Sequence, residues 1–119
     1  MRLAGLRGML FSGVLMGTSL LSQGVLANSD EMTSLLRDLG GLNGQSLACD
    51  QAALSVRARQ LVIDYVPKER GLGELFEEAT NAAFLLQGQS KSPCPESKVL
   101  AERIRSVEAT LKARQAKKE

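Results

Sequence analysis

The fold is decided by residues 46–67, SLACDQAALSVRARQLVIDYVP, which join a cysteine to a long run with helical periodicity. We expect a helix from Ser46 to Val66, ended by Pro67, which cannot continue it. Six apolar residues form one stripe on this helix: Leu47, Leu54, Ala58, Leu61, Val62 and Tyr65. Three more lie roughly opposite: Ala52, Val56 and Ile63. Because a helix that is apolar on two sides is typically packed on both, this helix is predicted to be central.

The chain contains two cysteines, Cys49 and Cys94, so only one intramolecular pairing exists. Cys49 falls in the first turn of the predicted 46–66 helix, and Cys94 immediately precedes Pro95, a favourable first-turn residue for another helix. In an up-down arrangement these two helix starts meet at the same end of the molecule. We therefore expect a structural disulfide, with free or catalytic thiols as the alternative.

Two further helices are predicted, one before and one after the 46–66 helix. The first begins at Asn28 or Ser29, where Asn28-x-x-Glu31 fits a capping box, and ends at Gly40-Gly41. The other runs from about Gly71 to Gln87, with Gly88 as its stop. Its apolar face is predicted to comprise six residues: Leu72, Leu75, Phe76, Ala79, Ala83 and Leu86.

The last helix begins at Pro95 and has a narrow apolar stripe, which we call its seam, on an otherwise charged surface. The seam consists of Leu100, Ile104, Val107 and Leu111. Residues 112–119 form a basic tail, which we expect to fray. The sequence therefore predicts an all-α fold, a small antiparallel up-down four-helix bundle over residues 28–111 with one disulfide.

Residues 1–27 have the three parts of a signal peptide. Arg2 and Arg7 precede an uncharged run, residues 9–21, and small or short residues lead to Ala27. The run is short for a membrane span of roughly 20 residues. We expect cleavage after about Ala27 and a periplasmic or secreted protein. The alternative is an uncleaved membrane anchor over residues 9–27.

The composition excludes several chemistries. The sequence has no histidine, the commonest general base near neutral pH and the commonest metal ligand. Glu74, Glu77 and Glu78 crowd the start of one predicted helix, where acids are favourable without any catalytic role. We expect no enzyme activity, no cofactor and no metal. An enzyme that uses these three carboxylates is the less favoured alternative.

Charge also limits the partners. The formal +2 comes from Arg2 and Arg7, so the mature part is neutral and nucleic acid is not an expected partner. Membrane contact is expected only through the leader or, weakly, through the basic tail. Phe84 and Leu85 lie off the apolar stripe of their helix. They either meet another helix of the bundle or form a surface for a partner.

These observations favour an exported, non-catalytic protein that acts as a protein-binding or accessory factor, with another envelope protein as its partner. A toxin-neutralising or inhibitor protein would also bind a protein partner without catalysis, and it is an alternative. A second alternative comes from a resemblance. Leu47-Ala48-Cys49-Asp50, the second cysteine more than forty residues later and the lysine-rich last helix resemble periplasmic acid-stress chaperones of the HdeA type. That resemblance implies a holdase with one disulfide.

Overall fold

The computed structural model describes residues 20–118, with side chains from residue 30 onward. This part of the chain forms four helices and no strand: α1 (Leu20–Ala48), α2 (Ala52–Tyr65), α3 (Arg70–Gln89) and α4 (Ser97–Lys118). The all-α expectation is therefore confirmed for residues 20–118. Most of the predicted signal peptide, residues 1–19, lies outside the described residues. Residues 20–27 already belong to α1.

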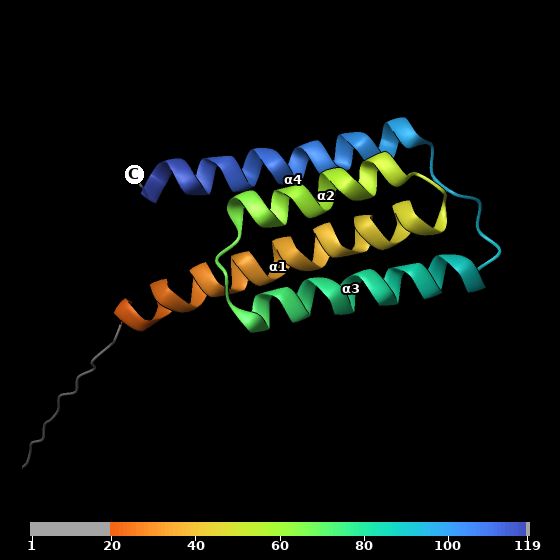
Figure 1. Cartoon of the computed structure of the whole chain (residues 1–119). Helices are drawn as coiled ribbons and strands as arrows, with labels where there is room; N and C mark the ends of the chain where they lie inside the picture. Colours follow the sequence, from red (N-terminus) through yellow and green to blue (C-terminus); the bar gives the residue numbers. More distant parts are fainter. Residues whose placement is uncertain (1–19, 119) are drawn as a thin grey trace, which may run out of the picture.

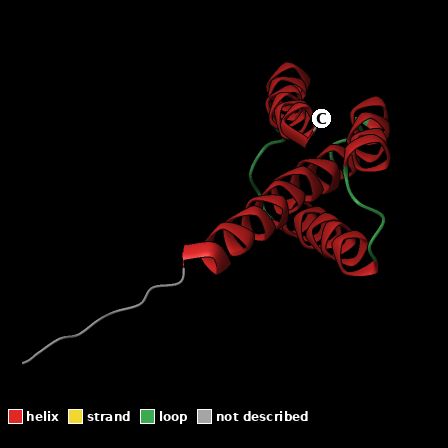
Figure 2. Cartoon of the chain, turned by 90° about the vertical axis from the view of Figure 1, so that its left-hand side faces the viewer, coloured by secondary structure: helices red, strands yellow, loops and turns green. Residues whose placement is uncertain are grey.

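Consecutive helices run in opposite directions, so α1 is parallel to α3 and α2 is parallel to α4 (Figure 1). The other three helices are arranged around α1 (Figure 2). The backbone of α2 also approaches that of α4, whereas the backbone of α3 approaches only α1 among the described helices. α3 is thus a separate layer on one side of α1.

The helix at the centre is not the predicted one. α1 is covered by neighbours on opposite sides, and α2 lies at the periphery. The second apolar face expected for α2 is open to solvent, and Val56 is 65% exposed. The reason lies in α1, whose glycines let α3 approach so closely that α1 takes the central position.

The prediction that the first helix ends at Gly40-Gly41 is also wrong, because α1 continues to Ala48. Gly40 and Gly44 face α3. A Cβ on Gly40 would lie 2.6 Å from the Cβ of Ala79. Gly41 has open space at the same position. Gly40 and Gly44 therefore permit a close helix crossing, and the packing outweighs the low helix propensity of glycine.

The turn between α1 and α2 takes Cys49 out of the predicted helix start. Asp50 adopts φ 59°, the left-handed conformation that reverses the chain, and α2 begins only at Ala52. α4 begins at Ser97, two positions after Pro95, and the basic run continues this helix to Lys118 instead of fraying after Leu111.

The hydrophobic core lies between α1, α2 and α4, with Phe76 reaching it from α3. Its buried members are Met32, Leu35, Leu36, Leu39, Leu42, Ala58, Leu61, Val66, Phe76, Leu100, Ile104, Val107 and Leu111. The seam predicted for the last helix is buried in full. α1 supplies more of this core than any other helix, as its central position requires.

Candidate functional site

The predicted disulfide is confirmed. Cys49 and Cys94 are bonded, with their Cα atoms 5.8 Å apart. The bond joins the turn between α1 and α2 to the loop between α3 and α4. It fastens both connections at one end of the molecule. A disulfide is compatible with an oxidising compartment outside the cytoplasm.

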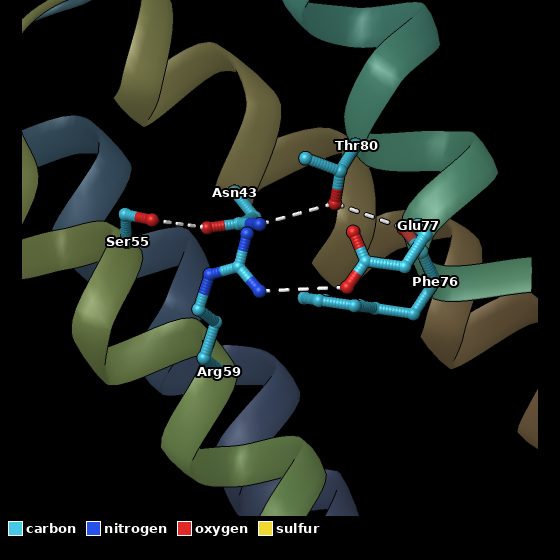
Figure 3. A network of polar contacts seen from close by, with 6 residues as sticks. All are labelled: Asn43, Ser55, Arg59, Phe76, Glu77 and Thr80. Atoms are coloured by element: carbon cyan, nitrogen blue, oxygen red, sulfur yellow. Dashed lines mark hydrogen bonds and ion pairs between the residues drawn. The ribbon is translucent and has the colours of Figure 1, made fainter. Parts of the chain in front are cut away.

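A buried polar network connects α1, α2 and α3 (Figure 3). Asn43 is fully buried, and its Oδ1 accepts a hydrogen bond from Ser55 Oγ at 2.6 Å. Asn43 Nδ2 donates to Thr80 Oγ1 at 3.1 Å, and Thr80 Oγ1 donates to the Phe76 carbonyl at 2.8 Å. The network satisfies the Asn43 amide oxygen and fixes how α2 and α3 dock on α1.

A second polar contact links α2 to α4 at the edge of the core. Glu108 is largely buried and accepts hydrogen bonds from Arg57 and from Lys112, the latter at 3.2 Å. The hydrogen bond from Arg57 lowers the pKa of Glu108, and Lys112 acts in the same direction, whereas partial burial opposes them. Glu108 is thus held ionised as the link between two helices.

The basic residues of α4 are partly used within the fold. Lys112 pairs with Glu108, and Arg114 pairs with Glu31 of α1, which brings the C-terminal end of α4 beside α1. This pairing explains why α4 stays helical beyond Leu111. None of the helices within residues 20–118 has both the length and the hydropathy of a membrane span.

A groove lies between α3 and α4, with α1 as its floor. Its volume is about 800 Å³. Gly41 and Gln45 lie on the floor, Leu86 on the α3 wall, Arg103 on the α4 wall, and Pro93 at the closed end. The groove exists because the backbone of α3 approaches α1 but not α4, which leaves a gap beside α4.

A smaller hollow of about 450 Å³ adjoins this groove. The two share Arg37, Ala83 and Leu86, and the smaller one extends back along α3 to Leu75. We call the two together the α3 trough. It runs along the flank of α3 from Leu75 to the loop that carries Pro93.

The predicted contact residues, Phe84 and Leu85, lie on α3 and are 45% and 55% exposed. No other described helix covers them. Leu86, which was expected on the buried stripe, is 70% exposed and lines the trough. The stripe is right for Phe76, but α4 does not close over the flank that carries Leu86. Sequence reasoning could not foresee this gap, because it depends on where α4 lies.

The three clustered glutamates, Glu74, Glu77 and Glu78, are exposed on α3, and Glu77 pairs with Arg59 of α2 at 3.4 Å. Within the part of the chain that the structure describes, no group of three or more metal-binding side chains converges. These carboxylates form a solvated helix face with one ion pair.

No protein-family model matches the sequence, and no curated protein or solved structure matches it. The class is therefore defined by the molecule itself: over residues 20–118 it is a small all-α protein of four helices, with one disulfide and an open trough beside α3.

Proposed function

We propose that the protein is a small exported, non-catalytic binding protein that acts as an accessory factor of another envelope protein. The observation that carries this proposal is the exposure of three consecutive large apolar side chains, Phe84, Leu85 and Leu86, on α3. Large apolar side chains that are exposed close together on a small domain mark a site of interaction. The contact surface is the C-terminal half of α3.

The fold holds this surface in one position. Thr80 is bonded through Asn43 to Ser55, and Gln45 Nε2 of α1 donates to Gln87 Oε1 of α3 at 3.0 Å. The close crossing at Gly44 adds a contact between helix backbones. A surface that is rigid before binding loses less conformational entropy on complex formation, which favours protein recognition.

The test is site-specific photo-cross-linking in the cell that exports the protein. A photoreactive residue at Leu85 is expected to form an adduct with a second envelope protein. Val56, on α2 and 65% exposed, is the control position and is expected to form none. The absence of an adduct from Leu85, or equal adducts from both positions, would refute the proposal. The adduct's identity also decides between an accessory factor and a toxin-neutralising or inhibitor protein.

A second candidate is an acid-activated holdase of the HdeA type, and one observation favours it. The ion pairs that join different helices in residues 30–118 all use a glutamate: Arg57–Glu108, Arg59–Glu77 and Arg114–Glu31. The hydrogen bond from Arg57 lowers the pKa of Glu108, so protonation of this carboxylate in acid weakens the α2–α4 contact. A holdase would use the apolar surface that this loosening exposes.

Titration from about pH 7 to about pH 2, followed by binding of the dye ANS and by suppression of client aggregation, separates the two candidates. A holdase gains dye binding and suppresses aggregation in acid. A protein that stays closed and inactive toward clients at low pH is not a holdase.

A further inference from the structure

We infer that the α3 trough binds one amphipathic helix of a protein partner, with a carboxylate of that helix between Arg37 and Arg103. This inference rests on the proposed function and specifies the chemistry of the partner. The occupant is a helix of about four turns whose apolar stripe lies along α3.

The shape of the trough carries the first step. Its lining on α3 extends from Leu75 to Ser90. At about 1.5 Å per residue this is about 22 Å, the length of roughly four helical turns. Leu86 and Ala83 line both hollows, so the trough offers two successive depressions along one flank of α3. Two depressions in a row suit successive apolar side chains on one face of a docked helix.

The lining chemistry carries the second step. The smaller hollow is lined mainly by apolar residues, whereas the larger one combines apolar side chains with polar and charged ones. The apolar lining residues include Leu75, Ala79, Ala82, Leu86, Pro93 and Val107. Three alanines, Ala79, Ala82 and Ala83, line the hollow nearer Leu75 and leave space there for a large partner side chain. At 70% exposure, Leu86 has the most apolar surface to lose when a helix covers it.

The third step concerns the charges that line the larger hollow, which determine the charge expected on the partner. The larger hollow is lined by Arg37 of α1, Arg103 of α4 and one carboxylate, Asp38. Among residues 30–118, neither guanidinium lies within 4.0 Å of a carboxylate, as a salt bridge would require. Two unpaired guanidiniums against one carboxylate favour an acidic side chain in this hollow, since arginine binds carboxylates with two parallel hydrogen bonds. Glu78 lines the smaller hollow, and its negative charge disfavours a second acidic side chain of the partner there.

The experiment measures fluorescence anisotropy of a labelled helical peptide of about 18 residues against the exported protein with its disulfide intact. The peptide carries a leucine stripe flanked by glutamates, and its twin has lysine at every glutamate position. We expect the glutamate peptide to bind roughly tenfold more tightly than the lysine peptide. This preference should shrink as salt is added, because the arginines are exposed.

Two variants and two matched controls locate the site. The double variant Arg37→Glu, Arg103→Glu should abolish or reverse the preference. Arg105→Glu, on the same helix as Arg103, exposed and outside both hollows, should leave it unchanged. Leu86→Asp should weaken both peptides by roughly tenfold, whereas Val56→Asp should weaken neither.

Equal binding of the two peptides overturns the inference. So does an equal change of preference in the Arg37→Glu, Arg103→Glu variant and in the Arg105→Glu variant. So does displacement of the labelled peptide by dodecanoate, which would make the occupant a lipid. A dimer in sedimentation that Leu86→Asp dissociates would make the occupant a second copy and also overturns the inference. An adduct from Leu85 together with equal peptide binding leaves the proposed function standing and removes this inference. Glutamate-selective binding without any adduct supports the trough as a site for an acidic helix but refutes the envelope partner of the proposed function.

Discussion

Gly44 of α1 lies directly against the backbone carbonyl of Thr80 in α3, so that a Cβ on Gly44 would lie 2.1 Å from that oxygen. The two helices therefore contact through backbone atoms at this point. A side chain at position 44 would force α3 away from α1. Because the backbone of α3 approaches only that of α1 among the described helices, this displacement would weaken the main contact that holds α3 in place.

Gly44→Ala is therefore expected to destabilise the protein by roughly 3 kcal/mol, at the upper end for overpacking, because neither backbone can yield locally. Gly41→Ala is the matched control. Its Cβ meets no atom within 4 Å, and it should stabilise α1 by up to about 1 kcal/mol through helix propensity. Urea unfolding of both variants measures the difference. Equal effects would show that the close crossing is absent.

The network around Asn43 gives a second prediction. Asn43→Ala leaves the buried Ser55 hydroxyl without its acceptor and opens a small cavity, so unfolding should become easier by roughly 2–3 kcal/mol. Asn81→Ala, an exposed position on α3, should change stability by less than about 0.5 kcal/mol. A double-mutant cycle with Ser55→Ala should give a coupling energy of about 1 kcal/mol. A coupling near zero would contradict the network.

Glu108 makes stability depend on pH. Its pKa is lower in the folded protein than its ordinary value of 4.5, so the unfolded chain binds the proton more readily. The stabilisation is complete above about pH 4.5 and is lost as the pH falls through the lowered pKa. Glu108→Gln should cost roughly 1 kcal/mol at neutral pH, since Arg57 is about half exposed and the pair is partly screened.

The difference between Glu108→Gln and the unsubstituted protein should therefore disappear in strong acid. Thermal unfolding at a series of pH values measures it. Glu102→Gln, exposed on the same helix, is the control and should follow the unsubstituted protein throughout. A stability difference that stays constant across the pH series would mean that protonation of the Glu108 carboxylate is not coupled to folding.

Removal of the disulfide gives a fourth prediction. The bond spans 45 residues of sequence, and its loss should reduce stability by about 4 kcal/mol on the chain-entropy account. Cys49→Ser with Cys94→Ser, or reduction with dithiothreitol, should give the same loss in urea unfolding. A larger loss for the double serine variant than for reduction would indicate a packing defect at the new side chains.

Several features of this fold can be predicted from the sequence alone. The four helices, the disulfide and the buried seam on α4 each rest on strong local signals: periodicity, two cysteines and a regular spacing of apolar residues. The end of α1 and its central position could not be predicted in the same way. Glycine commonly follows the last residue of a helix, and only the presence of Ala79 and Ala83 opposite Gly40 and Gly44 reverses that preference.

The candidate site was only partly predictable. Phe84 and Leu85 were singled out because they fall off an apolar stripe, a local property. Leu86 fits the stripe perfectly and is nevertheless exposed, because its environment depends on the distance between α3 and α4. Arg37 and Arg103 are 66 positions apart and belong to different helices, so no local pattern places them on one hollow.

The single cross-link lies at one end of a long, narrow molecule, and this makes the two ends unequal. At the far end, the connection between α2 and α3, Val66–Glu69, is held by packing and by noncovalent bonds alone. We therefore expect local unfolding to begin at this end and to spread toward the Cys49–Cys94 disulfide. Amide exchange should accordingly be fastest around Pro67 and slow progressively toward Cys49, with the open form remaining one connected and rapidly reclosing chain.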